Sequence, residues 1–252
     1  MRSEKIHNSD PNLWQGQLVR LTAFPTKLEL DVQQSWWNDL FGDTAEKINY
    51  DKKQFLHQET GTLEGNPLIL KMQPGRIDWH YVARQELSEL MEGIPALGPF
   101  LHVLEYFSPL MLKWLGKCPE LKRLAFGAVL LQPAADHASA YESLGKYLRS
   151  VQVDPNTTDF NFQINRRRAS KVGIPNLEIN RLTRWSALKM GVHITDPTGG
   201  GLRPAERFAA RLDLDINTSQ EFAGPLPSDK HAALYQELVE LGREITANGE
   251  IA

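Results

Sequence analysis

The sequence predicts an α+β protein built from a mostly antiparallel sheet with helices packed on one face. The first indication is residues 157–194, where Phe160, Phe162 and Ile164 alternate with polar residues and Gly173 marks a turn. This pattern is typical of a long two-stranded hairpin with one apolar face. The second indication is the order of the remaining segments, in which strands and helices follow one another twice.

The first half of the chain reads as strand, helix, three strands and helix. The strands are expected at 17–24, 54–60, 67–72 and 76–82, and the helices at 28–41 and 99–107. Ser108 and Pro109 suggest the N-cap and first residue of one further helix, which ends near Gly116.

The same order begins again at Leu121. A strand at 121–131 and a helix at 135–149 precede the hairpin, and a strand at 207–216 and a last helix after Pro227 follow it. We therefore expect two similar strand-helix-three-strand-helix halves, at 14–119 and 120–252, without recognisable sequence identity between them. Residues 1–13 are expected to form a flexible N-terminal arm.

Composition narrows the class of protein. The 252 residues carry a formal charge of −3, so the whole molecule does not attract nucleic acid or anionic membranes. Cys118 is the only cysteine, which excludes an intrachain disulfide and disfavours a zinc site. No apolar run resembles a signal peptide or a membrane span. A cytoplasmic protein without a cofactor is expected.

One short motif carries a resemblance to a known family. The run Gln73-Pro74-Gly75-Arg76-Ile77-Asp78-Trp79 after a strand is similar to the "strand, Pro-Gly, strand" signature of a sporadically distributed, uncharacterised bacterial family of proteins of this size. The segments 121–126 and 212–216 lie where that family has comparable ones, so the resemblance covers most of the chain in order. It implies genes that travel with mobile elements or phage-defence clusters, and it lends no catalytic residues.

Basic residues gather on the predicted hairpin. The group comprises Arg166, Arg167, Arg168, Lys171, Arg181 and Arg184, with Trp185 beside them. Converging guanidinium groups next to an indole could hold phosphates and stack on a base, which predicts a nucleic-acid or phosphate site. Two alternatives stay open: a solvated hairpin tip whose arginines pair with carboxylates such as Glu178, and a protein interface.

Trp36 and Trp37 are adjacent on a predicted helix and therefore point about 100° apart. One ring is expected in the core and the other at a partner interface, where Trp is a preferred anchor. The alternative is that neighbouring helices cover both rings.

No catalytic or metal site stands out. His102 and Glu105 have the spacing of metal ligands on a helix but lack a second pair. Asp213 and Asp215 share one face of a strand, as half-exposed strands require, and Asp78 lies on another strand. The sequence thus favours a non-enzymatic binding subunit of a bacterial multi-protein system that contacts a protein, nucleic acid or a second copy of itself. The alternative is a metal-dependent hydrolase or nuclease that uses these aspartates.

Overall fold

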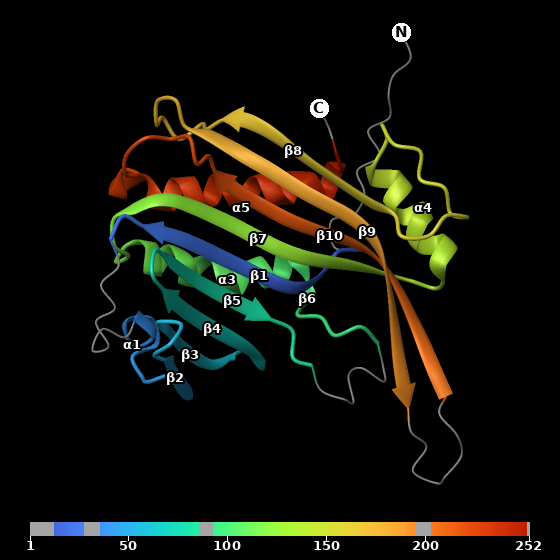
Figure 1. Cartoon of the computed structure of the whole chain (residues 1–252), viewed down its shortest axis with the longest axis horizontal. Helices are drawn as coiled ribbons and strands as arrows, with labels where there is room; N and C mark the ends of the chain where they lie inside the picture. Colours follow the sequence, from blue (N-terminus) through green and yellow to red (C-terminus); the bar gives the residue numbers. More distant parts are fainter. Residues whose placement is uncertain (1–12, 28–35, 86–92, 195–202, 251–252) are drawn as a thin grey trace.

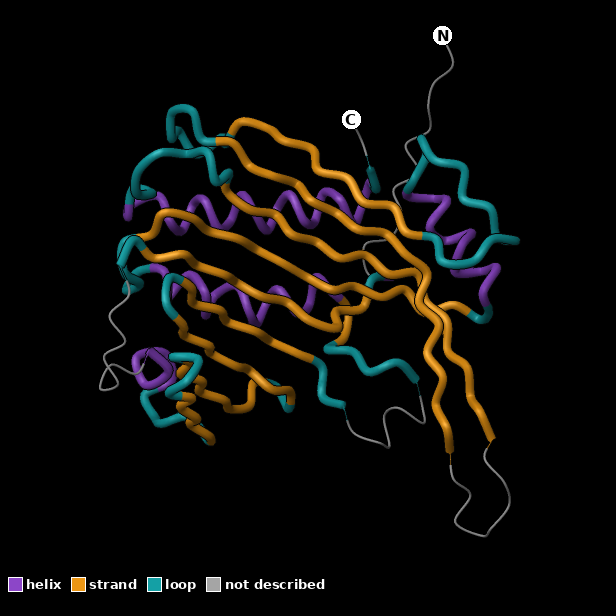
Figure 2. Tube along the Cα trace, in the orientation of Figure 1, coloured by secondary structure: helices purple, strands orange, loops and turns teal. Residues whose placement is uncertain are grey.

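The structure, a computed structural model, describes residues 13–27, 36–85, 93–194 and 203–250 (Figure 1). The expected N-terminal arm and residues 28–35 of the first expected helix lie outside these ranges. A single large sheet dominates the molecule, and helices α3 and α5 lie side by side across one of its faces (Figure 2). The α+β class and the antiparallel pairing predicted from the sequence are confirmed.

The first half of the chain supplies six strands and two described helices. They are β1 (Gln15–Pro25), α1 (Trp36–Phe41), β2 (Lys47–Asp51), β3 (Leu56–Leu63), β4 (Asn66–Gln73), β5 (Arg76–Val82), β6 (Gly98–Pro99) and α3 (Phe100–Leu115). The second half supplies β7 (Leu121–Ala134), α4 (His137–Tyr147), β8 (Asn161–Ala169), β9 (Glu178–Ile194), β10 (Arg203–Thr218), the short 3-10 helix η2 (Ser228–Lys230) and α5 (His231–Asn248).

The two halves meet at an antiparallel pair between β1 and β7 in the middle of the sheet. Outward from this pair the order is β5, β4, β3 and β2 on one side and β10, β9 and β8 on the other. In each half the last long strand therefore lies next to the first, β5 next to β1 and β10 next to β7. The proposed internal duplication stays a prediction, because strand order alone does not establish that the halves superpose.

Two local expectations are wrong. The helices expected at 99–107 and after Ser108 form one continuous helix, α3, with Pro109 inside it. The buried stripe of Leu104, Phe107 and Met111 continues past Pro109, and packing of that stripe outweighs the lost backbone hydrogen bond. The strands expected for the first half do not include β2, a strand of five exposed residues in which only Ile48 and Tyr50 alternate with polar side chains.

Aromatic side chains fill the core between the sheet and the helices. Trp14, Tyr147 and Trp185 form one cluster, with ring centroids 5.1–5.9 Å apart. Trp79 and Trp114 belong to a second cluster under α3. Burial of such large rings supplies much of the apolar area removed from water on folding. No helix in the described part of the chain combines the length and apolar character that a membrane crossing requires.

Candidate functional site

The basic hairpin does not form one site, because alternate residues of β8 point to opposite faces of the sheet. Arg166 and Arg168 face the helical layer. Arg166 lies 3.4 Å from Glu250, and Arg168 lies 3.8 Å from Glu237 and 3.6 Å from Glu244. These ion pairs fasten the β8 edge to α5 and the residues just after it. The expectation of a converging arginine site is wrong for this pair.

Trp185 and Arg181 also face inward. Trp185 is fully buried, and its Nε1 donates to Glu250 (2.9 Å) and to Thr183 (3.2 Å). Arg181 lies directly opposite Arg166 and is only 9% exposed. A nucleic-acid base cannot stack on an indole that the core covers. Trp185 therefore has a structural role instead of the expected one in phosphate binding, and Arg181 is too buried to form part of a surface phosphate site.

The remaining basic residues of the hairpin lie apart from Arg166 and Arg168. Arg167 makes two hydrogen bonds of 2.9 Å to Glu221, which raise the pKa of the guanidinium group. Arg184 donates to the Gln163 amide oxygen from the face of the sheet opposite the described helices α3 and α5. Lys171 is exposed in the β8–β9 turn, where its backbone N–H donates to Glu237.

Trp36 and Trp37 are both buried, each 5% exposed. Trp36 packs edge-on against Trp114, and Trp37 stacks on Trp79. The Trp37 ring lies against Gly61, where an added Cβ would come within 2.3 Å of it. The interface role expected for one of these rings is wrong, since the helices and the sheet cover both.

The weak metal candidates stay separate. His102 and Glu105 form an exposed pair on α3, with Nδ1 and Oε2 3.0 Å apart. Asp213 pairs with Arg211, whereas Asp78 pairs with Arg76 on the far side of β1. Within the residues that the structure describes, no three His, Cys, Asp or Glu side chains lie close enough together to hold a metal ion.

The face of the sheet opposite α3 and α5 carries a continuous network of polar side chains, and we call it the open face. Arg123 donates to Asn217 (3.3 Å), Asn180 donates to the same amide oxygen (3.0 Å), and Asn165 donates to Asn180 (3.1 Å). Asn217 also donates to Asp215 (3.0 Å). One hydrogen-bonded chain thus links four neighbouring strands, β7, β10, β9 and β8.

Arg20 extends the network across the centre of the sheet. Its Nη2 lies 3.3 Å from Asp215, two strands away, because Gly127 on the intervening strand β7 leaves room for the side chain. A Cβ at Gly127 would lie 2.4 Å from Arg20 Nε. Gly127 therefore allows an arginine of β1 to reach a carboxylate of β10.

Asp78 anchors the other side of the open face. Burial tends to raise its pKa, but neighbouring His80 and hydrogen bonds from Arg76 and Thr22 hold the pKa well below its ordinary value. Asp78 is accordingly a fixed anion that orders β1 and β5, and it is not available as a proton-transfer group.

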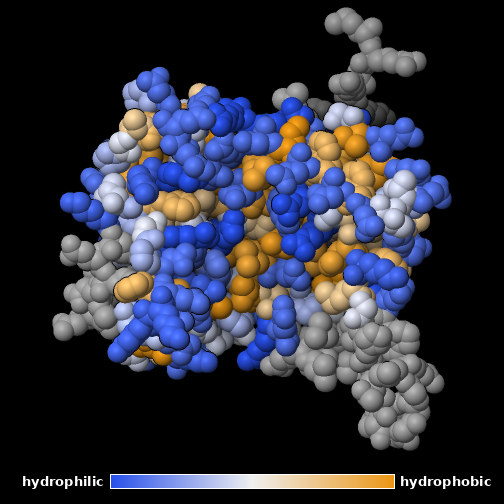
Figure 3. Space-filling view, viewed as in Figure 1, coloured by the Kyte–Doolittle hydropathy of each residue, from blue (hydrophilic) through white to orange (hydrophobic). Residues whose placement is uncertain are grey.

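A shallow hollow of about 230 Å³ lies at the centre of the open face. Leu18, Val129 and Leu182 form its half-buried apolar part, and charged and amide groups surround them. The polar lining side chains are Arg20, Gln163, Arg184, Asp213 and Asp215. Figure 3 looks onto this face and shows apolar patches between polar ones near its centre. Sequence reasoning found Arg184, Asp213 and Asp215 but missed Arg20, because only the fold brings β1 beside β7 and near β10.

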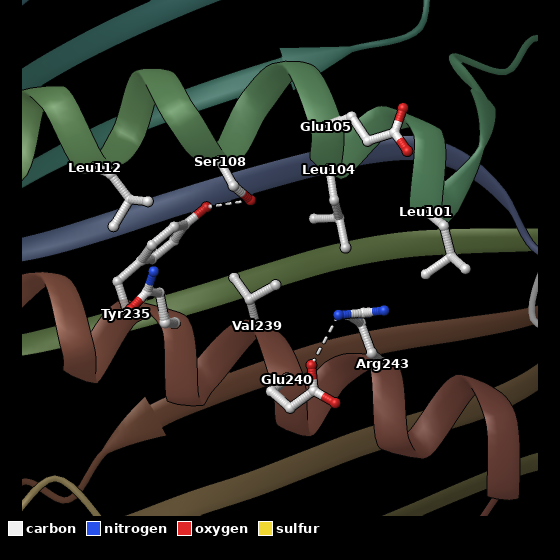
Figure 4. Close-up of a pocket in the computed structure, with 10 residues that line it drawn as sticks. Leu101, Leu104, Glu105, Ser108, Leu112, Tyr235, Val239, Glu240 and Arg243 are labelled. Atoms are coloured by element: carbon white, nitrogen blue, oxygen red, sulfur yellow. Dashed lines mark hydrogen bonds and ion pairs between the residues drawn. The ribbon is translucent and has the colours of Figure 1, made fainter.

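A second concavity of about 540 Å³ lies between α3 and α5 (Figure 4). Leu101, Leu104, Leu112 and Val239 make its apolar surface. Most of its polar groups pair with one another or with near neighbours: Ser108 with Tyr235 (3.4 Å), Arg243 with Glu240 (2.9 Å) and Glu105 with His102 (3.0 Å). Nothing in this groove selects one ligand chemistry, which leaves the open face as the stronger candidate.

Comparison of the chain with protein-family models, curated proteins and solved structures finds no match. The resemblance of residues 73–79 to the sporadic bacterial family therefore stays a prediction, and the function has to be argued from the site.

Proposed function

We propose that the protein is a non-catalytic binding subunit that binds a partner polypeptide on the open face of its sheet. The observation that carries the proposal is the hollow around Leu182, where apolar side chains lie inside a ring of arginine, aspartate and amide groups. Protein interfaces commonly combine an apolar centre with a polar rim, and arginine is enriched in them.

The charge distribution favours a polypeptide over nucleic acid. Arg20, Arg76 and Arg211 of the open face each pair with an aspartate, and Arg167 pairs with Glu221. Phosphate binding depends on cations that are free to replace counterions, and these arginines already have carboxylate partners. Arg123 and Arg184, by contrast, donate to amide oxygens. We infer a partner segment that places an apolar side chain over Leu182 and a carboxylate near Arg184.

Affinity purification with matched variants tests this function. Leu182→Glu and Arg184→Glu change the hollow, and Ala233→Glu, on the exposed side of α5, adds the same single negative charge as Leu182→Glu. A partner protein should co-purify with the wild type and with Ala233→Glu, and both open-face variants should lose it. Thermal unfolding of each variant checks that the fold is retained.

Two outcomes contradict the proposal. One is a partner that both open-face variants retain at wild-type levels. The other is salt-sensitive binding of single-stranded DNA or RNA that Arg184→Glu abolishes, which would assign the face to nucleic acid instead.

A further inference from the structure

Among the described strands, β2 forms one edge of the sheet and pairs only with β3. All five of its residues, Lys47–Asp51, are exposed. An edge strand presents unpaired backbone N–H and C=O groups that can pair with another strand. At the opposite edge, β8 carries three consecutive arginines held by ion pairs, which is a common protection against such pairing.

Exposed apolar side chains gather at the β2 edge. Of the six large hydrophobic residues that are exposed in the described part of the chain, Phe41, Ile48, Tyr50 and Phe55 belong to α1, β2 and the β2–β3 turn. Ile48 and Tyr50 are 52% and 44% exposed and share one face of β2. Phe55 is 58% exposed and adopts a positive φ of 49°, which a bulky residue rarely does. Such a concentration is typical of an interaction surface.

The sequence of β2 is complementary to itself when it is read in the antiparallel direction. Lys-Ile-Asn-Tyr-Asp has Asn49 at its centre, a cation at one end and an anion at the other. We propose that two copies of this chain pair through β2 about a two-fold axis at Asn49. Lys47 then faces the Asp51 of the second copy, Ile48 faces its Tyr50, and the two Asn49 amides face each other.

Each of these contacts is favourable in an antiparallel ladder. Opposite charges and aromatic–aliphatic pairs stabilise directly opposed cross-strand positions. The two-fold axis repeats every contact, which is the self-complementarity that an isologous dimer requires. The backbone of β2 allows this register in either of its two possible hydrogen-bonding patterns. Directly opposed pairs in an antiparallel ladder are alternately hydrogen-bonded and non-hydrogen-bonded, and a two-fold axis can pass through either kind of pair.

The result is one sheet that runs through both copies, with each open face left free. Five residues a side form a small contact, so we expect a dimer that dissociates on dilution. Sedimentation equilibrium of the full chain over a range of concentrations measures this association directly. The wild type should shift from monomer to dimer as concentration rises.

Charge reversal identifies the surface. Lys47→Asp places two pairs of aspartates opposite each other in the dimer, and Asp51→Lys places two pairs of lysines there. Each variant alone should dimerise roughly tenfold more weakly or worse. An equimolar mixture of the two variants restores both ion pairs and should form a heterodimer, and the double variant Lys47→Asp/Asp51→Lys should form a homodimer again. Both positions are exposed, but Asp51 Oδ1 also accepts hydrogen bonds from the backbone N–H groups of Lys53 and Gln54. Thermal unfolding followed by circular dichroism therefore checks that each variant, and the double variant, keeps the fold.

A cross-link tests the register. In the proposed dimer the two Asn49 Cα atoms lie roughly 4.5–5.5 Å apart, within the range of a disulfide. Asn49→Cys should therefore form a covalent dimer under mild oxidation, whereas Lys47→Cys should not, because its two copies lie about 13 Å apart. Any of four results would overturn the proposal. They are a wild type that is monomeric at every concentration, single charge variants that dimerise as the wild type does, a mixture of these variants that stays monomeric, and equal cross-linking of both cysteine variants.

Discussion

Replacing Glu250 by alanine tests whether the hairpin residues are structural. Glu250 is 7% exposed and accepts hydrogen bonds from Trp185, Thr183 and Arg166. The substitution leaves a buried indole N–H and a buried hydroxyl without their carboxylate partner. At roughly 1 kcal/mol for each hydrogen bond, the free energy of unfolding should fall by about 3 kcal/mol.

Urea denaturation followed by tryptophan fluorescence measures this change. Glu240→Ala is the matched control: its carboxylate is 68% exposed and pairs only with Arg243 on the surface of α5, so a change within about 0.5 kcal/mol is expected. Equal effects of the two substitutions would refute the structural role assigned to Glu250 and would reopen Arg166 and Trp185 as binding residues.

Three further predictions address other parts of the fold. Gly61→Ala should lower the melting temperature because its Cβ meets the Trp37 ring, whereas Gly145→Ala, which has open space around it, should not. A carboxyl with a lowered pKa contributes stability above its unfolded pKa of about 4 and loses it as the pH falls through the folded value. The stability deficit of Asp78→Asn at pH 7, measured by urea denaturation, should therefore shrink as the pH falls below about 4. Burial raises the pKa of the Cys118 thiol to about 12, so iodoacetamide at pH 8 should modify it quickly only after unfolding.

Local patterns predicted the elements that bury one face. Alternation across residues 157–194 correctly indicated the β8–β9 hairpin, and the stripe of Leu234, Leu238 and Leu241 indicated α5. Strand β2 was not predicted because its alternation covers only five residues, and both of its apolar side chains, Ile48 and Tyr50, are exposed. Pro109 misled the assignment of α3, because tertiary packing outweighed a local rule.

The candidate site was harder to predict because its parts are far apart in sequence. The run of three arginines suggested convergence, yet the two-residue period of a strand sends Arg167 to one face and Arg166 and Arg168 to the other. The contact between Arg20 and Asp215 depends on strand order, and 195 residues separate the two side chains. No local pattern carries that information.

Site-specific photo-cross-linking in the native host tests the central claim most directly. A photoreactive amino acid at Leu182 lies in the hollow of the open face, and the same group at Ala233 lies on the opposite, helical side. The account predicts one defined protein adduct from position 182 and none from position 233. Adducts from position 233 alone, or nucleic-acid adducts from position 182, would contradict it.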